Sequence, residues 1–558
     1  MNPRSVGKIV IAFTAAAALT VAGCSSSNGS KGEAPKAEFG PDGKVILDVF
    51  AQQDQDTDLN TNLATKAMSD KFKIQFKFQT SSMDAAASKE KRQISLASGD
   101  YPDLFMLIPY VDAFSKVEVQ KLGKQGVAVP LEDLIKEHAP NVQKLLDSNK
   151  IFREMSVAPD GHIYALPQAA DCYHCSYPDK LWINSTWLKN LGLQQPKTTE
   201  DLRTVLRAFK TQDPNRNGKA DEIPMTTDLR NSNLIGYLMG GFAYAPVGAT
   251  PAVRGLLTLD GDKVTTPVDK PEWRDGLRYI NSLYKEGLID PGSFTQPGDA
   301  LQAIGNNPKG VQIGSSPVLH PGIFVTLGSK DGRDKQYDAV PPLTGPTGKS
   351  YTALSEPTST GYSFLLTNKA SKEGRIAAIK LLDHMFTDAG KLETWSGPEN
   401  VWWVKPAPGD VALDANTTPM YKSKPEAEVP KNVRWAAMAT YNFNTAFRNA
   451  QVVPKDIYSE EGYERRLFEA TKLYEGREDK AKIYPEESVW VDSSVVNELA
   501  TMKTNLDSYV TQGQLAFITG SKNIDTEWDA WVKGLDGVGL KRYLELNQQA
   551  YDKHKSGK

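Results

Sequence analysis

The stretch from Asp213 to Glu222 carries oxygen-bearing side chains in a regular pattern. Four of these side chains occupy odd-numbered positions of the stretch: Asp213, Asn215, Asn217 and Asp221. Gly218 at the sixth position supplies a sharp turn, and Lys219 at the seventh would offer its backbone carbonyl. Ca²⁺ takes about six to eight oxygen ligands, and this alternation lets one short loop turn them toward a common centre. The pattern therefore predicts a structural calcium-binding loop.

The predicted calcium loop departs from the EF-hand pattern at one position. An EF-hand has a bidentate glutamate at its twelfth residue, which here is Pro224, and we expect Glu222 to replace it. Thr198 and Asp201 predict a capped helix before the loop, with an apolar stripe formed by Leu202, Val205, Leu206 and Phe209. The alternative interpretation is a surface turn rich in Asp and Asn that binds no metal.

The first residues of the chain have the pattern of an export signal. Arg4 and Lys8 form a positive segment, and residues 9–21 form an apolar segment that is too short to span a bilayer. The segment is followed by small residues and a cysteine, Val21-Ala22-Gly23-Cys24. This end of the chain resembles the lipobox of bacterial lipoproteins.

The lipobox resemblance implies cleavage after Gly23 and a diacylglycerol thioether on Cys24, which would hold the protein on the extracellular face of the cytoplasmic membrane. Residues 1–23 are then a lipoprotein signal peptide. Residues 24–44 are rich in Ser, Gly, Lys and Pro, and we expect them to form a flexible tether. Plain secretion with a chance cysteine is the alternative.

Composition favours a soluble multidomain protein and argues against nucleic-acid binding. The 558 residues allow two or three domains, each with its own core. Lys and Arg total 65 and Asp and Glu total 68, and no long basic run interrupts this balance. A protein that binds nucleic acid would carry a basic patch to neutralise phosphates.

Cys172 and Cys175 are the cysteines that remain once Cys24 is lipidated. Their spacing suits redox exchange, half of a zinc site or a short disulfide. Zinc would need further ligands, and no second pair of this spacing occurs. We therefore expect an inert staple or two free thiols.

Strands and helices alternate in the first part of the chain. Strand-like segments at 45–50, 72–78 and 104–108 are separated by a helical stretch near 85–96, which predicts a mostly parallel sheet. Ligands of such sheets bind outside the strand ends, so Asp103, beside the third strand, is a candidate ligand contact.

Four motifs occur in a fixed order along the chain: Ser98-Gly-Asp-Tyr-Pro-Asp103, Gly161-His-Ile-Tyr-Ala-Leu-Pro167, Ile183-Asn-Ser-Thr-Trp-Leu-Lys-Asn-Leu-Gly192 and Pro196-Lys-Thr-Thr-Glu-Asp201. Together with the lipobox and the calcium loop, this set resembles the extracellular solute-binding proteins (family 1) of carbohydrate ABC importers. It is most similar to the large lipoprotein branch of Gram-positive bacteria. The resemblance extends from about Val45 to Lys553.

The resemblance implies an α/β fold of the periplasmic-binding-protein type II, with two lobes joined by hinge strands and a ligand trapped between them. Lobe I would contain residues 45–168 and about 350–400. Lobe II would contain about 169–349 and about 401–558. Alginate-binding members carry a calcium loop of similar spelling, which implies that the ion is held by Asp213, Asn215, Asn217, Lys219, Asp221 and Glu222.

Sugar recognition requires aromatic faces for the C–H faces of the ring and planar polar groups for its hydroxyls. Candidates are chosen by position: Tyr173 and His174 at the first crossing between lobes, Tyr244 after Gly-Gly, Trp402 and Trp403 in a loop bounded by Pro and Gly, and Gln52, Gln53 and Asp54 after the first strand. For each aromatic residue the alternative is a place in the core, and for the polar group it is a solvated turn.

These features predict a monomeric, lipid-anchored receptor that binds an oligosaccharide and delivers it to the permease of an ABC importer. A lipid-anchored enzyme acting on polysaccharides, or an adhesin, is the alternative. Neither G-x-S-x-G nor H-E-x-x-H occurs in the chain, so we expect no enzymatic activity.

Replacing Cys24 with Ala should leave the protein without lipid and release it from the cell. One diacylglycerol supplies two acyl chains, and two chains suffice for stable anchoring. Fractionation of cells and medium measures the effect. Quantitative retention of the Ala variant in the membrane fraction would contradict the lipobox assignment.

Overall fold

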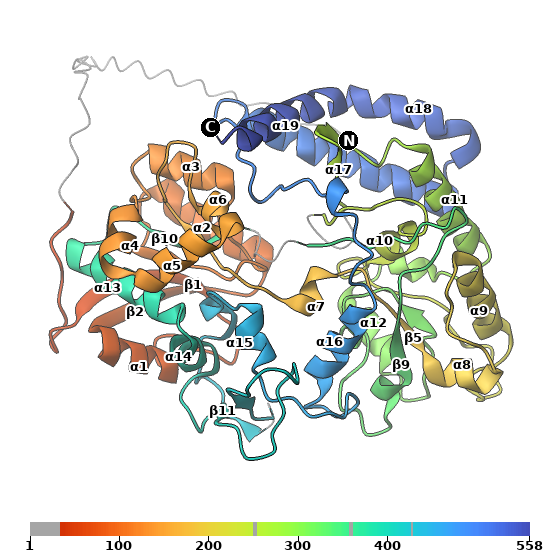
Figure 1. The fold of residues 1–558 in the computed structure, drawn as a ribbon, viewed down its shortest axis with the longest axis horizontal. Helices are drawn as coiled ribbons and strands as arrows, with labels where there is room; N and C mark the ends of the chain where they lie inside the picture. The colour runs from red at the N-terminus through yellow and green to blue at the C-terminus, as the bar shows by residue number, and fades with distance from the viewer. Residues whose placement is uncertain (1–33, 249–253, 356–360, 426–427, 558) are drawn as a thin grey trace, which may run out of the picture.

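The computed structural model describes residues 34–248, 254–355, 361–425 and 428–557. They form a mixed α/β protein with two lobes side by side and the short helix α7 (Tyr173–Ser176) between them (Figure 1). The predicted signal peptide 1–23 and Cys24 lie outside the described residues. Among these residues, no helix is long and apolar enough to cross a membrane.

Lobe I is built on a five-stranded sheet in the order β2-β1-β3-β10-β4. Its strands are β1 (Val45–Gln52), β2 (Ile74–Ser81), β3 (Leu104–Met106), β4 (Leu166–Pro167) and β10 (Tyr362–Leu366). β1 runs parallel to β2, with Val45 opposite Ile74, and parallel to β3, with Val49 opposite Leu104. β10 comes from a distant part of the chain and pairs antiparallel with β3 and β4.

Helices cover both faces of this sheet. They are α1 (Leu63–Phe72), α2 (Ala85–Ser98), α3 (Lys116–Lys124), α4 (Glu132–His138), α5 (Pro140–Ser148), α6 (Lys150–Ser156), α13 (Lys372–Met385) and α14 (Asp388–Lys391). Leu104 and Met106 belong to one buried cluster, whereas Phe105 belongs to another. Successive residues of a strand point to opposite faces, so β3 contributes to a core on each side.

Lobe II is built on a smaller antiparallel sheet, with β5 (Leu181–Asn184) between β8 (Ser315–Ser316) and β9 (Tyr337–Val340). A hairpin of β6 (Thr258–Asp260) and β7 (Lys263–Thr265) packs nearby. Its helices are α8 (Ser185–Leu191), α9 (Thr199–Thr211), α10 (Leu234–Met239), α11 (Pro271–Lys285), α12 (Gly298–Gly305), α16 (Tyr463–Lys472), α17 (Val496–Thr519), α18 (Ile524–Gly537) and α19 (Leu540–Lys555).

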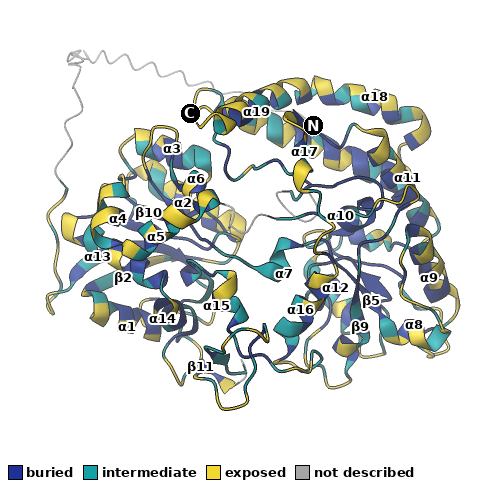
Figure 2. Cartoon of the chain, viewed as in Figure 1, coloured by how far each residue is buried: buried dark blue, intermediate teal, exposed yellow. Residues whose placement is uncertain are grey.

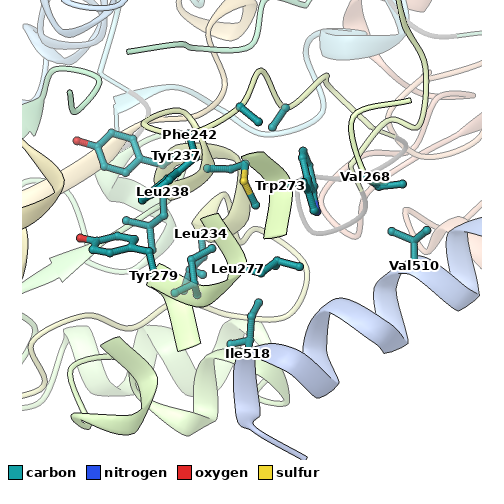
Figure 3. Packing of buried hydrophobic residues seen from close by; sticks show 14 of the residues in the cluster. Leu234, Tyr237, Leu238, Phe242, Val268, Trp273, Leu277, Tyr279, Val510 and Ile518 are labelled. Carbon is teal, nitrogen blue, oxygen red and sulfur yellow. The ribbon is translucent and has the colours of Figure 1, made fainter. Parts of the chain in front are cut away.

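Helix α11 lies at the centre of the lobe II core. Trp273 and Leu277 point from it toward α10, while Ile518 approaches from α17 (Figure 3). The outer faces of α17, α18 and α19 are exposed and their inner faces are buried (Figure 2). The three C-terminal helices therefore complete lobe II.

Lobe I extends further along the chain than the predicted boundary near residue 400. Trp435, Met438 and Tyr441 belong to the core of lobe I. After β10, the chain therefore returns to lobe II only after residue 441. A small sheet of β11 (Trp403–Val404) and β12 (Lys422–Ser423), followed by α15 (Thr445–Asn449), lies at the lower edge between the lobes (Figure 1).

A segment between α16 and α17 contacts both lobes. On lobe II, Ile483 forms a β-bridge with Thr258. On lobe I, the indole Nε1 of Trp490 donates to the Glu154 carbonyl at 2.7 Å, and Lys116 Nζ donates to the Val489 carbonyl at 2.9 Å. We call residues 483–490 the strap, because any movement of the lobes apart must strain or release it.

The last part of the predicted tether is held against lobe I. The Ile46 amide donates to the Glu38 carbonyl at 2.8 Å, and Phe39 forms a β-bridge with Val45. Lys44 Nζ lies 2.7 Å from Asp70 of α1. Residues 38–44 are therefore held against lobe I by contacts made before and at the start of β1.

Candidate ligand-binding cleft

Four cavities adjoin one another in a row: three lie between the lobes, and the fourth lies on lobe I beside them. We call them the hinge pocket (about 120 Å³), the α7 cavity (about 490 Å³), the central cavity (about 730 Å³) and the lobe I pocket (about 180 Å³). Tyr173 lines the first two, Leu354 lines the second and third, and Tyr110 lines the third and fourth. The row provides an elongated site suited to an extended ligand.

The lobe I side of the row lies at the carboxyl ends of β1 and β3. The chain leaves β3 through Ile108 and Pro109 and presents Tyr110, whose side chain is 68% exposed. Ligands of α/β sheets bind beyond the carboxyl ends of strands, because the chain turns away there and leaves a crevice. Tyr110 therefore offers an accessible aromatic face where the central cavity meets the lobe I pocket.

A buried polar network supports the loop that carries Tyr110. The Gln52 amide oxygen accepts from the Ile108 amide at 2.8 Å, and its nitrogen donates to Ser88 Oγ at 3.0 Å. Arg92, which is 0% exposed, binds Asp112 in a bidentate pair at 2.6 and 2.9 Å. The loop is thus held from α2 beneath it.

The lobe I pocket brings together several residues predicted from the sequence. Gln53, Asp54 and Trp402 line it together with Gln52. The guanidinium carbon of Arg434 lies 3.5 Å from the centroid of the Trp402 ring, which orients the indole. Gln52 is 2% exposed and its amide is engaged with the protein, so it shapes the pocket instead of offering hydrogen bonds to a ligand.

Two predicted ligand contacts lie elsewhere. Trp403 is 8% exposed, and its indole Nε1 donates to the Gly397 carbonyl at 3.0 Å, so it is a core residue. Asp103 lies at the amino end of β3, opposite the cleft, where its carboxylate accepts from the Asp48 amide at 2.9 Å. The prediction used the wrong end of the strand: ligands of such sheets bind at carboxyl ends.

The first crossing places α7 in the row of cavities. Cys172 and Cys175 form a disulfide across this single helical turn, which selects one of the alternatives that the spacing left open. Tyr173 lines the hinge pocket and the α7 cavity, and its hydroxyl donates to Glu475 at 2.9 Å. His174 also lines the hinge pocket.

Tyr244 lines the central cavity from lobe II but is 4% exposed. Only the edge of such a buried ring can meet a ligand in this structure. Arg230 and Asn231 line the same cavity and supply polar groups. Sequence inspection missed these two residues, because polar side chains in an irregular segment carry no distinctive pattern. Tyr110 had a usable signal, because it directly follows an apolar strand.

Burial keeps two histidines near α7 neutral. It lowers the pKa of His174 to about 3 and that of His320 to about 4, and the positive charge of Lys180 acts in the same direction. Burial also lowers the pKa of Lys180 to about 7. The Lys180 ammonium donates to the His174 carbonyl at 2.8 Å, which anchors the hinge segment.

The predicted calcium loop follows α9 in lobe II and lines none of the four cavities. The Asp213 carboxylate accepts from the amides of Asn217 and Gly218 at 3.0 and 3.1 Å, which curls the loop. Asn217 also donates to Asp221 at 2.9 Å. Gly218 has φ +71°, which glycine adopts without strain.

The surroundings of the Glu222 carboxylate indicate whether the loop could hold an ion. One of its carboxylate oxygens is buried without a hydrogen-bond partner in the described chain, and burial raises its pKa. A cation beside that oxygen would satisfy it, so the donor set fits Ca²⁺. Within the described part of the chain, the carboxylate oxygens of Asp213, Asp221 and Glu222 do not all lie within 4.8 Å of one another. They would have to draw closer around an ion.

Known proteins share this sequence and architecture, although none of the models of known protein families matches the chain. The fructooligosaccharide ABC transporter substrate-binding protein FusA of Streptococcus pneumoniae is 28% identical over 484 residues, which cover 84% of this chain and 83% of FusA. The lipoprotein LipO of Bacillus subtilis is 24% identical over 83% of this chain and 84% of LipO.

Solved structures of related proteins share the fold. FusA of S. pneumoniae in complex with kestose superposes with a TM-score of 0.68 at 24% identity, over 92% of this chain and all of FusA's. The alginate-binding protein AlgQ2 without calcium ion gives a TM-score of 0.65 at 23% identity, over 91% of this chain and 98% of AlgQ2. The chain is thus similar over most of its length to substrate-binding proteins of ABC importers. The predicted two-lobed α/β fold is confirmed by the solved structures.

The stability of the protein should fall as the pH drops from about 6.5 to about 4, in part because of His174 and His320. Both histidines titrate near 6.5 when unfolded, but their folded pKa values are about 3 and about 4. In that window the unfolded state binds protons that the folded state excludes. Each histidine then contributes about 1.4 kcal/mol of destabilisation per pH unit.

Urea unfolding of the wild type and of a His174→Asn/His320→Asn double variant measures this contribution. The variant should lose less stability than the wild type over the acidic window, and both should show the same pH dependence above about pH 7.5. Parallel curves at every pH would contradict the neutral, buried state of these histidines.

Proposed function

We propose that the protein is a lipid-anchored extracellular receptor that binds an oligosaccharide between its lobes and delivers it to an ABC importer. The observation that carries the proposal is the row of cavities between the lobes. Both aromatic rings and polar side chains line it. Rings cover the apolar faces of sugars and polar groups bind their hydroxyls, so an extended row suits a chain of sugar units.

The relatives support the same class of ligand. FusA is named for fructooligosaccharides and its structure contains kestose, while AlgQ2 is named for alginate. These proteins are binding proteins, which supports a receptor without enzymatic activity over a polysaccharide-active enzyme. LipO is named as a lipoprotein, which supports the proposed anchor on Cys24.

Binding should close the lobes. The chain crosses between the lobes through α7, between β9 and β10, and after Tyr441, and the strap contacts both lobes. A ligand can shift an open–closed equilibrium only by its differential affinity for the two states, which here means contacts to both walls of the cleft. Small-angle scattering should show compaction when the sugar is added.

Replacing Tyr110 with Ala should weaken oligosaccharide binding by about 1.5 to 3 kcal/mol, or roughly ten- to hundredfold in Kd, because a large apolar contact is lost. Calorimetry with a panel of neutral and acidic oligosaccharides first identifies a ligand and then measures the variant. Tyr110→Phe, which keeps the ring, should retain most of the affinity.

Ile94→Ala is a matched control for Tyr110→Ala. Ile94 is an exposed apolar residue on α2 that lines none of the cavities, so its loss should leave Kd unchanged. If no sugar in the panel binds the wild type, the receptor assignment fails. Conversion of a sugar into products on incubation would instead favour the enzyme alternative.

We also propose that the Asp213–Glu222 loop holds a structural Ca²⁺, with Asp213, Asn215, Asn217, Asp221 and Glu222 supplying side-chain oxygens and Lys219 its carbonyl. Bound there, the ion would neutralise the carboxylates and fix the loop that leads from α9 toward α10. The position of the loop outside the cleft supports a role in stability and not in ligand contact.

Calcium should raise the thermal stability of the protein, whereas chelation should lower it without unfolding the chain. An ion that binds only the folded state adds about 2.7 kcal/mol at a hundredfold excess over Kd. Scanning calorimetry with calcium and with chelator measures the shift. Asp213→Asn/Asp221→Asn should abolish it, and an equal shift in that variant would contradict the loop assignment.

A further inference from the structure

The hinge pocket forms one end of the row of cavities. Its lining comes from every part of the protein that meets at the hinge: Asp171, Tyr173 and His174 from the first crossing, Trp395 from lobe I, Thr445 and Arg448 from α15, and Glu464 and Phe468 from α16. It adjoins the α7 cavity through Asp171 and Tyr173. An extended ligand that follows the row would place a terminal unit here.

Aromatic rings form the walls of the hinge pocket. Trp395 packs against Phe443 with ring centroids 5.2 Å apart, and Tyr173 packs against Phe468 at 5.1 Å. Trp395, Tyr173 and Phe468 are only partly buried, so parts of these rings stay accessible. Such walls match the apolar faces of a sugar ring.

Arg448 has hydrogen-bonding capacity that the protein does not use. Its guanidinium lies 5.5 Å from the centroid of the Phe443 ring, and its Nε is buried without a hydrogen-bond partner. Within the described part of the chain it forms no ion pair shorter than 4.0 Å. A buried, unsatisfied donor costs free energy, and ligand oxygens would satisfy it.

Two carboxylates provide acceptors in the same pocket. Asp171 uses one oxygen, Oδ2, to accept from the Thr445 amide at 3.0 Å and from the Thr445 hydroxyl. The Glu464 side chain is 38% exposed and lies 3.5 Å from His174 Nδ1. Each therefore keeps acceptor capacity toward the pocket. Donors and acceptors together are what sugar hydroxyls require, since a hydroxyl both donates and accepts.

The charge of the pocket discriminates between ligand classes. One guanidinium faces two carboxyl groups, and His174 is neutral because burial lowers its pKa to about 3. Burial raises the pKa of Glu464, while the charge of Arg448 acts in the opposite direction and favours the carboxylate. A uronate would bring a third carboxylate beside Asp171 and Glu464, and like charges in a partly buried site repel strongly. A neutral sugar unit adds no charge.

We infer that the hinge pocket binds the neutral terminal unit of the oligosaccharide, with Arg448 donating to its hydroxyls and Asp171 and Glu464 accepting from them. This inference rests on the proposed receptor function and deepens it by naming the class of sugar. It separates two ligand classes represented among the relatives, neutral fructooligosaccharides for FusA and the acidic polymer alginate for AlgQ2.

Calorimetry with two matched sets of oligomers tests the inference. The neutral set contains fructo-, gluco-, galacto- and manno-oligosaccharides, and the acidic set contains galacturonate and mannuronate oligomers of the same lengths. We expect a member of the neutral set to bind at least about tenfold more tightly than any acidic oligomer, the scale of one unfavourable charged contact. Tighter binding of an acidic oligomer would overturn the inference.

Substitutions in the hinge pocket test whether the sugar unit binds there. Arg448→Gln and Glu464→Gln should each raise Kd for the best neutral ligand about tenfold or more, because each removes a charge-assisted hydrogen bond. Glu464→Gln preserves the shape of the side chain, so it still tests the pocket if Arg448→Gln fails to fold. Arg207→Gln, on the outer surface of α9, is the matched control and should leave Kd unchanged.

The outcomes also separate this inference from the receptor assignment. If neutral sugars bind and Tyr110→Ala weakens them while both hinge-pocket variants bind normally, the protein is a sugar receptor and the hinge-pocket inference is wrong. If no oligomer of either set binds the wild type, the receptor assignment itself fails. Improved binding of acidic oligomers to Glu464→Gln, with neutral binding weakened, would support the charge argument directly.

Discussion

The lobe I wall of the cleft depends on one buried ion pair. Arg92 in α2 binds Asp112 through two hydrogen bonds, and a third bond reaches Glu118 at the start of α3. Removing one partner of such a pair typically costs about 3 to 5 kcal/mol, because the other charge is left buried. Together with the Gln52 amide, this pair fixes the loop after β3 and hence the place of Tyr110. An exposed ring on an unsupported loop would lose entropy on binding, whereas here most of that ordering has occurred during folding.

The hinge shows how connectivity creates a site. The chain passes from lobe I to lobe II at α7, returns to lobe I between β9 and β10, and passes to lobe II again after Tyr441, while the strap contacts lobe I through Trp490. Segments from both lobes therefore come together at the hinge. Their polar groups cannot all be satisfied by regular secondary structure, which leaves donors such as Arg448 available to a ligand. The same crowding keeps His174 and His320 neutral.

Local pattern predicted many of the elements well. The sheet strands at Val45 and Leu104 and the capped helix from Thr199 follow from hydrophobic periodicity and from the Thr198–Asp201 capping box. Gln53, Asp54, Trp402, Tyr173, His174 and Tyr244 all line the row of cavities. The sequence could not show that Trp402 lines a cavity while Trp403 is buried. Both lie in a loop bounded by Pro and Gly, where no helical or strand periodicity indicates which side chain points inward. Arg448 gave no signal either, since its significance lies in its lack of a partner.

The sequence by itself determined the class of the protein, the calcium-loop spacing and the alternation of strands and helices, because these depend on residues that are near one another in the chain. Tertiary structure alone decided which end of β3 faces the cavities, where lobe I ends and which aromatic residues remain accessible. Those properties depend on contacts between distant segments, such as β10 pairing with β3 and Trp435 packing in the lobe I core. Burial and hydrogen-bond satisfaction are set by these long-range contacts, so residue type and spacing do not specify them.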